Sequence, residues 1–297
     1  MFISRGSYPC SLVCSFLLLA CGFSPASASA QTPSPTGDYE LGLLYFQGYF
    51  LPQNYEKAAL LFQEGAAKGD PRAQFMLGYF YANGYGLPQD FAKAAGLYRA
   101  AALQGHAHAE NNLASLYQHG QGLPKNLTEA VRWYLAAAMQ GEPVAQTNLA
   151  TLYFNGDGVP QNFERAAHWY RAAAEAGQPD AQNNLSSMYA SGQGVPRNYT
   201  EAFRWAHKAA EQGLPAAQSN LAYLYEHGLG APLDYSAAYA WYSRAAHTGN
   251  QEASLRLASL RQIMTLRQID SANALLSPLP PASAPLICNH PLAAGNL

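Results

Sequence analysis

The stretch Pro143–Gln178, PVAQTNLATLYFNGDGVPQNFERAAHWYRAAAEAGQ, decides the fold, because the rest of the chain repeats it. Moving 36 residues in either direction reaches the same kinds of residue. Self-similarity at a fixed period of this size is typical of a solenoid of stacked repeats. The registered series are Tyr45, Tyr81, Tyr117, Tyr153, Tyr189 and Tyr225; Gly48, Gly84, Gly120, Gly156, Gly192 and Gly228; and Leu41, Leu77, Leu113, Leu149, Leu185 and Leu221.

Each repeat is predicted to be a helix pair. In the third repeat, Ala109, Leu113 and Leu116 recur at helical spacing and predict a first helix, helix A, over 107–118. Gly120 follows it and suits the left-handed conformation that ends a helix. A second helix, helix B, is predicted over 163–176 in the fourth repeat, and a capping residue precedes helix B in all six repeats. These capping residues are Asn54, Asp90, Asn126, Asn162, Asn198 and Asp234.

These repeats resemble the Sel-one-like repeat, a helix-turn-helix relative of the tetratricopeptide repeat. The resemblance covers about six repeats, residues 38–250, and implies a right-handed α-solenoid that binds or scaffolds other proteins. The first repeat departs from the pattern, with Phe50 in place of the second turn glycine and Gly37 in place of the entry alanine, as in a terminal cap. The matching residues of the fourth repeat are Ala145-Gln146, Asn148-Leu149-Ala150, Tyr153, Gly156, Gly158-Val159-Pro160, Asn162, Ala166, Trp169-Tyr170, Ala173-Ala174 and Gly177.

The N-terminal residues 1–30 are predicted to be a secretory signal, with one early arginine, a short apolar run and then small residues. Two processing routes compete. Ala28-Ser29-Ala30 resembles an ordinary cleavage site, which we favour, whereas the residues around Cys21 resemble a bacterial lipobox that would make Cys21 a lipidated N-terminus. The apolar run is too short to span a membrane. Residues 31–37 form a spacer before the array.

The repeat pattern decays after Asn250. We expect residues 251–276 to form two capping helices, the second opened by a capping box at Thr265 and Gln268. Residues 277–297 are proline-rich and predict a disordered tail, in which Cys288 is expected to be a free thiol.

Composition narrows the function classes. Charged residues make up 12% of the chain, against about a quarter in an average protein, and the net charge is −2. Such a chain offers no electrostatic footprint for nucleic acid or for an anionic membrane. No nucleophile–base, phosphate-loop or zinc motif occurs, so we expect neither catalysis nor a cofactor. His106 and His108 are interpreted as exposed histidines, with no metal role.

A helical wheel of helix A places one set of residues away from the stack. Stacked repeats would align this set into a polar, uncharged strip, on the concave face if the array is tetratricopeptide-like, and such a surface suits hydrogen bonding to a peptide backbone. This polar strip comprises Phe75, Tyr79, Asn83, Asn111, Ser115, His119, Thr147, Thr151, Asn155, Asn183, Ser187, Ser191, Ser219, Tyr223 and His227.

An asparagine row flanks the polar strip: Asn112, Asn148, Asn184 and Asn220. In related tetratricopeptide modules an asparagine at this position holds the main chain of the ligand. The alternative is that each amide bonds the backbone of a neighbouring repeat and maintains the stack. The hypothesis is that Asn148 and Asn184 contact ligand. The residues expected to bind peptide are Asn112, Asn148, Asn184, Asn220, Asn111, Ser115, Thr151, Ser187, Tyr79 and Tyr223.

Together these features predict an exported, monomeric, non-catalytic adaptor that binds another protein or a peptide segment in the periplasm or outer envelope. A membrane association is expected only if Cys21 is lipidated. Three alternatives remain open: a secreted factor acting on a host protein, a periplasmic regulator of a membrane receptor, and a hydrolase of cell-wall or lactam substrates. The lack of a nucleophile–base motif argues against the last.

Overall fold

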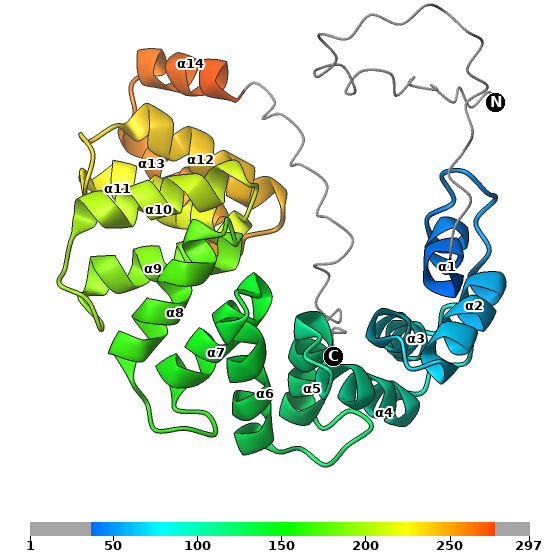
Figure 1. Ribbon diagram of the computed structural model, residues 1–297. Coiled ribbons are helices and arrows are strands. Elements are labelled where there is room, and N and C mark those ends of the chain that lie inside the picture. Colours follow the sequence, from blue (N-terminus) through cyan, green and yellow to red (C-terminus); the bar gives the residue numbers. More distant parts are fainter. Residues whose placement is uncertain (1–36, 277–297) are drawn as a thin grey trace, which may run out of the picture. The chain divides into compact units, whose positions relative to one another are not determined.

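The computed structural model describes residues 37–276, and every regular element in that range is an α-helix. The predicted signal, the possible lipidation at Cys21, most of the spacer and the proline-rich tail with Cys288 lie outside the described residues. Figure 1 shows the helices following one another as stacked pairs, which confirms an all-α solenoid of six helix-turn-helix repeats and a C-terminal helix pair. Between residues 37 and 276 no helix is both long and apolar enough to cross a membrane.

The helix boundaries follow the repeat. The A helices are α1 (Asp38–Gln47), α3 (Pro71–Asn83), α5 (Ala107–His119), α7 (Pro143–Asn155), α9 (Pro179–Ser191) and α11 (Pro215–His227). The B helices are α2 (Tyr55–Ala67), α4 (Phe91–Ala102), α6 (Leu127–Met139), α8 (Phe163–Glu175), α10 (Tyr199–Glu211) and α12 (Tyr235–His247). The capping pair is α13 (Gln251–Ile263) and α14 (Leu266–Leu275).

The predicted caps form as expected. All six capping residues before the B helices accept a hydrogen bond from a backbone N–H of the first turn, for example Asn162 Oδ1 from Arg165 N at 2.8 Å. The first glycine of each turn adopts the left-handed conformation, as at Gly156 with φ of 81°. Thr265 and Gln268 form the capping box that opens α14.

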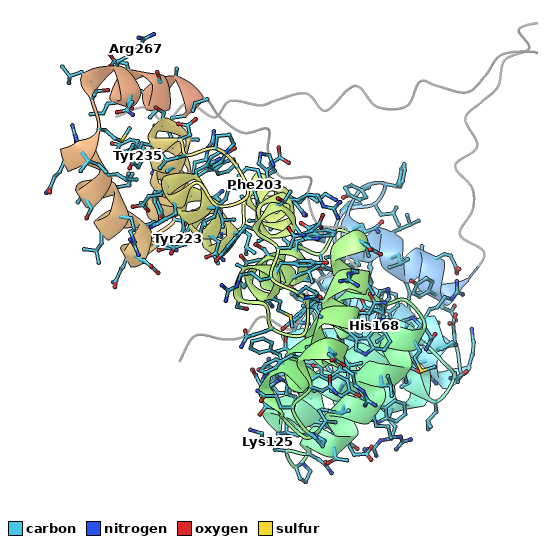
Figure 2. All side chains as sticks on the ribbon, turned by 90° about the vertical axis from the view of Figure 1, so that its left-hand side faces the viewer. Lys125, His168, Phe203, Tyr223, Tyr235 and Arg267 are labelled. Atoms are coloured by element: carbon cyan, nitrogen blue, oxygen red, sulfur yellow. The ribbon has the colours of Figure 1, made fainter. Side chains whose placement is uncertain are left out.

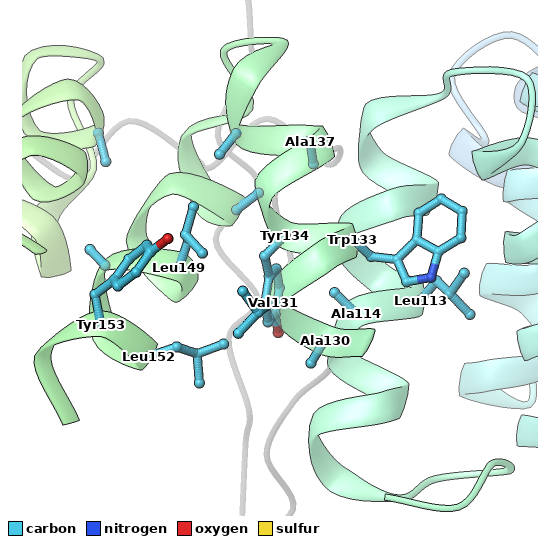
Figure 3. Packing of buried hydrophobic residues seen from close by; sticks show 14 of the residues in the cluster. Leu113, Ala114, Ala130, Val131, Trp133, Tyr134, Ala137, Leu149, Leu152 and Tyr153 are labelled. Carbon is cyan, nitrogen blue, oxygen red and sulfur yellow. The ribbon is translucent and has the colours of Figure 1, made fainter. Parts of the chain in front are cut away.

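The core lies between the two helix layers and runs from repeat to repeat. Tyr134 of α6 is 1% exposed, and in Figure 3 it stands between the apolar residues of its own repeat and those of α7. Leu113, Leu149 and Leu152 are likewise buried. The alanine pairs at the end of helix B are also buried in the second to fifth repeats, as at Ala173-Ala174, and their small side chains leave room for neighbouring helices. A single helix pair therefore leaves an apolar face that only its neighbours can cover.

The second glycine of each turn packs against the previous repeat. A Cβ placed on Gly158 would lie 2.7 Å from the backbone carbonyl carbon of Leu127, at the start of the preceding helix B. The corresponding atom on Gly86 would lie 2.5 Å from the carbonyl carbon of Tyr55. Within residues 37–276 no helix precedes the first repeat, and there Phe50 occupies the glycine position with 76% of its surface exposed. This departure from the repeat thus follows from the position of the first repeat at the start of the described stack.

A buried glutamine joins each of the fourth, fifth and sixth repeats to the one before it. Gln182 donates from Nε2 to the Ala174 carbonyl of the preceding helix B at 3.0 Å and accepts from Gln212 of its own repeat at 2.8 Å. Glu110 holds this position in the third repeat and is 5% exposed. Its carboxylate accepts from Gln140 at 2.7 Å but has no proton to donate when ionised. Burial raises the pKa of the Glu110 carboxyl above its usual value, an effect that the Gln140 hydrogen bond partly offsets.

The glycine contact makes a first prediction. Gly158 and Gly177 both have positive φ, 73° and 94°, but a Cβ on Gly177 would meet nothing within 4 Å. We expect Gly177→Ala to lower the free energy of unfolding by about 1–2 kcal/mol through backbone strain alone. Gly158→Ala should lower it by a further ~1–3 kcal/mol because the added methyl overpacks the interface. Chemical denaturation of the two variants measures the difference, and equal losses would refute the proposed close approach.

The glutamate position makes a second prediction. Because the folded-state pKa of Glu110 is raised, its protonation favours the fold, and the free energy of unfolding falls as pH rises through that pKa. Glu110→Gln provides the amide donor that Gln182 provides at the same position of the fifth repeat. We therefore expect the free energy of unfolding of the variant to be higher by about 1 kcal/mol at pH 7. The gain should shrink in acid, where the wild-type carboxyl is protonated. Thermal melts at neutral and acidic pH test this, and a variant less stable than wild type at pH 7 would contradict it.

Candidate functional site

The asparagine row takes part in hydrogen bonds between repeats. Asn148 donates from Nδ2 to Asn111 Oδ1 of the preceding repeat at 3.2 Å, and Asn220 donates to Asn183 Oδ1 at 2.8 Å. Asn112 accepts from the neighbouring Asn111 at 3.2 Å. Asn112, Asn148 and Asn220 therefore bond to asparagine side chains, whereas the alternative interpretation supposed a bond to a neighbouring backbone.

The structure corrects the placement of Asn111. The helical wheel put this side chain on the polar strip, facing away from the stack, but it is 7% exposed, as is Asn112. The wheel considered one helix alone, whereas the next A helix covers this position and provides Asn148 as a partner. Asn111 thus lies within the interface between α5 and α7.

Asn184 differs from Asn148 and Asn220 in its partners. The residue that would pair with it in the preceding repeat is Thr147, whereas the partners of Asn148 and Asn220 at this position are Asn111 and Asn183. Thr147 directs its hydroxyl to the Pro143 carbonyl of its own helix at 2.9 Å. The Asn184 amide lies instead beside the hydroxyl of Tyr170. Burial raises the pKa of the Tyr170 phenol, and hydrogen bonds with Thr151 and Asn184 offset part of this rise.

A pocket of about 240 Å³ opens beside Asn184, between α7, α8 and α9. Three predicted residues of the polar strip, Thr151, Asn155 and Ser187, line it, and the Thr151 hydroxyl lies 2.8 Å from that of Tyr170. We call this hollow the α7–α9 pocket. Its lining residues are Thr151, Phe154, Asn155, Tyr170, Asn184, Ser187, Met188 and Gln193, and none of them is charged.

Sequence reasoning missed four of these residues. Phe154 and Met188 were not singled out, Tyr170 was noted only as a matching residue of the repeat, and Gln193 belongs to the turn after α9. The signal that could have revealed the pocket is Thr147 between Asn111 and Asn183 at the same repeat position, since a change at this position alters what the next repeat's asparagine can bond.

The hydroxyls of the polar strip follow a common pattern. Ser187 donates to the Asn183 carbonyl at 3.2 Å, Ser191 to the Ser187 carbonyl at 2.9 Å, and Thr151 to the Thr147 carbonyl at 3.0 Å. A hydroxyl that donates within its own helix keeps lone pairs for an outside donor. Ser187 is exposed and Thr151 half-buried, so both can accept from a ligand N–H.

The remaining predicted site residues lie further along the strip. Ser115 is half-buried and its carbonyl lies 2.9 Å from His119 Nδ1. Tyr79 joins an aromatic cluster with Phe46 and Tyr85, and burial, with a smaller contribution from Tyr85, raises its pKa to about 12. Tyr223 is 41% exposed and stacks on His227 with the ring centroids 4.1 Å apart; it is labelled in Figure 2.

The two loop histidines are not simply exposed. His106 is half-buried, stacks on Phe75 at 4.8 Å and accepts the Ala109 N–H through Nδ1 at 3.2 Å, so it caps α5. Burial, with a smaller contribution from His108, lowers the pKa of His106 to about 4, which keeps the ring neutral and able to cap. His108 Nδ1 lies 3.6 Å from the buried Glu142. Across residues 37–276, no three His, Cys, Asp or Glu side chains come together as a metal site.

The asparagine contacts between repeats make a third prediction. A double-mutant cycle of Asn183→Ala and Asn220→Ala should give a coupling of about 0.5–1.5 kcal/mol, measured by chemical denaturation, because the two side chains share one hydrogen bond. Thr147→Ala with Asn184→Ala is the matched control at the corresponding positions one repeat earlier, and there we expect a coupling near zero. Similar couplings in the two cycles would show that Asn184 is bonded into the stack in the same way as Asn220.

Comparison with known proteins agrees with this geometry. The Sel1 repeat matches six consecutive segments, residues 35–70, 71–106, 107–142, 143–178, 179–214 and 215–250. A comparison with curated proteins found no match.

Two solved structures are similar in both sequence and fold. One is c5321, a protective antigen present in uropathogenic Escherichia coli strains, at 35% identity and a TM-score of 0.73, covering 80% of this chain and 51% of that one. The other is a Sel1 repeat protein from Oxalobacter formigenes, at 34% identity and a TM-score of 0.68, covering 75% of this chain and 64% of that one. The chain therefore spans about half to two thirds of these structures.

Sel1 repeat proteins generally mediate protein–protein interaction, and their fold is a scaffold that is typically non-catalytic. The six matched segments together cover most of this chain, and they coincide with the six helix pairs of the structure. The chain belongs to the Sel1 repeat family.

Proposed function

We propose that this protein is an exported, non-catalytic adaptor that binds an extended polypeptide along the polar strip. The observation that supports it best is the uncharged row of side chains whose hydroxyls donate within their own helices. Their lone pairs remain available to peptide N–H groups, and asparagine amides nearby supply donors for peptide carbonyls. A strip without formal charge recognises a main chain better than a charged tail.

Export is proposed from the sequence of residues 1–30, which has the order of a charged start, an apolar run and a small-residue cleavage site. The expected location is the periplasm or outer envelope. Fractionation of cells that express the full chain, followed by mass spectrometry of its N-terminus, separates cleavage after Ala30 from lipidation at Cys21. An intact Met1 on cytoplasmic protein would overturn the proposal of export.

The adaptor proposal makes a fourth prediction. Asn184→Ala with Ser187→Ala should reduce affinity for a captured peptide about tenfold, since two hydrogen-bonding groups of the strip are lost. Because Ser187 is exposed and Asn184 bonds no neighbouring asparagine, we expect little change in melting temperature. Peptides selected from a random display library on residues 31–297 supply the ligand. Arg132→Ala with Lys125→Ala, on the exposed side of helix B and the loop before it, is the control that should bind as wild type.

Two outcomes would count against peptide binding along the polar strip. One is a double variant that binds every selected peptide with wild-type affinity. The other is a loss of binding in the helix B control, which would move the recognition surface to the opposite layer. Failure to select any peptide at all would overturn the adaptor proposal itself.

A second candidate is a secreted factor that acts on a host protein. The observation that favours it is the 35% identity to c5321, which is described as a protective antigen of uropathogenic Escherichia coli strains. Mass spectrometry of culture supernatant against the envelope fraction distinguishes the two locations, and retention of the protein in the envelope would exclude a freely secreted factor.

A further inference from the structure

We propose that the α7–α9 pocket binds one uncharged aromatic side chain with a hydroxyl tip, that of a tyrosine, from the bound polypeptide. This inference rests on the proposed peptide-binding function and adds to it a specificity that the polar strip alone does not provide. The pocket's volume, walls and position along the strip each support it.

The size of the pocket favours a single side chain. At about 240 Å³ it is smaller than the ~300–1,000 Å³ of pockets that hold whole cofactors or drug-sized ligands. Thr151 and Ser187 belong to both the pocket and the polar strip. A peptide that follows the strip would therefore pass the mouth of the pocket and could insert one residue.

The walls of the pocket favour an aromatic body. Phe154, Tyr170 and Met188 contribute two rings and a thioether. Aromatic side chains gain from edge-to-face or offset contacts with other rings, and a methionine sulfur packs favourably against them. A short polar side chain would leave these apolar groups uncovered, and an aliphatic one would lose the ring contacts.

The polar groups of the pocket favour a neutral hydroxyl tip. Thr151, Tyr170 and Asn184 form a cluster of two hydroxyls and an amide, which together can both donate to and accept from a phenol. Burial raises the pKa of Tyr170, so its hydroxyl keeps its proton at neutral pH. The lining contains no Lys, Arg, Asp or Glu, and a charged tip would lose its hydration without gaining a counter-charge.

The pocket depends on a position that varies between repeats. In the neighbouring interfaces the amides of Asn148 and Asn220 are bonded to an asparagine of the previous repeat. Thr147 stands at that position here and bonds its own helix, and the Asn184 amide lines the pocket beside the Tyr170 hydroxyl. The Asn184 amide is therefore available to a ligand between the fourth and fifth repeats because no asparagine of the fourth repeat bonds it.

The test uses defined probes on the array with the methionine methyl groups labelled for NMR. N-acetyl-tyrosinamide should shift the Met188 methyl signal with a saturable, roughly millimolar Kd, as expected for a small fragment. N-acetyl-phenylalaninamide should bind several-fold more weakly, and the O-phosphorylated tyrosine derivative should cause no shift. Thr151→Val should abolish the preference for tyrosine over phenylalanine while leaving phenylalanine binding unchanged.

Blocking the pocket provides a second measurement. Ser187→Trp places an indole at the exposed mouth and should abolish the shift, whereas Lys125→Trp, at an exposed position in the loop before α6, should not. Circular dichroism melts check that both variants are folded. A tyrosine derivative that causes no saturable shift in the wild type, or that binds equally in Ser187→Trp, overturns the inference.

The display selection separates this inference from the proposed function. Selected peptides that are enriched in tyrosine and lose affinity for Ser187→Trp support both. Peptides that lack tyrosine, bind the strip and keep their affinity for Ser187→Trp would contradict the pocket inference but not the adaptor proposal. Recovery of no binding peptide would remove the adaptor proposal, and with it the role of the pocket in peptide recognition.

Discussion

The structure depends on the close contact of each turn with the repeat before it. A helix pair of this size cannot cover its own apolar face, so it is stable only where a neighbour packs against it. The second glycine of each turn permits that contact because a side chain there would collide with the backbone at the start of the preceding helix B. The buried glutamine of helix A adds a hydrogen bond to the end of the same helix. Both ends of helix B are thus held by the repeat that follows.

This constraint explains which features the sequence predicted. The helices, the capping asparagines and aspartates, and the left-handed glycines all serve every interface in the same way, so they recur every 36 residues. Six copies in register identify the structural role of each recurring position, even though one copy alone would not. The first repeat supports this reasoning, because Phe50 replaces the glycine in the one repeat that has no earlier helix behind it in the described part of the chain.

The candidate site was predicted less completely, for a physical reason. A helical wheel assigns each residue a direction from its own helix, and it cannot show that a neighbouring helix covers that direction, as α7 covers Asn111. Nor can it show that Tyr170 of helix B reaches across to Thr151 of helix A. His106 was similarly misjudged, because its stacking on Phe75 depends on how the end of the second repeat folds back onto α3. Contacts of this kind depend on the spacing of helices, which periodicity alone does not provide.

The residues that depart from the repeat are therefore the best indicators of a specific function. At the recurring positions, selection for the stack alone accounts for the side chain. Selection for the stack alone does not account for Thr147, because an asparagine there would have added a hydrogen bond between repeats like those made by Asn148 and Asn220. The loss of that bond costs stability at one interface and leaves a polar amide beside a pocket. A protein that gives up a structural hydrogen bond at only some of its equivalent interfaces has a different requirement there, and binding a ligand is the requirement that the uncharged, partly aromatic pocket best fits.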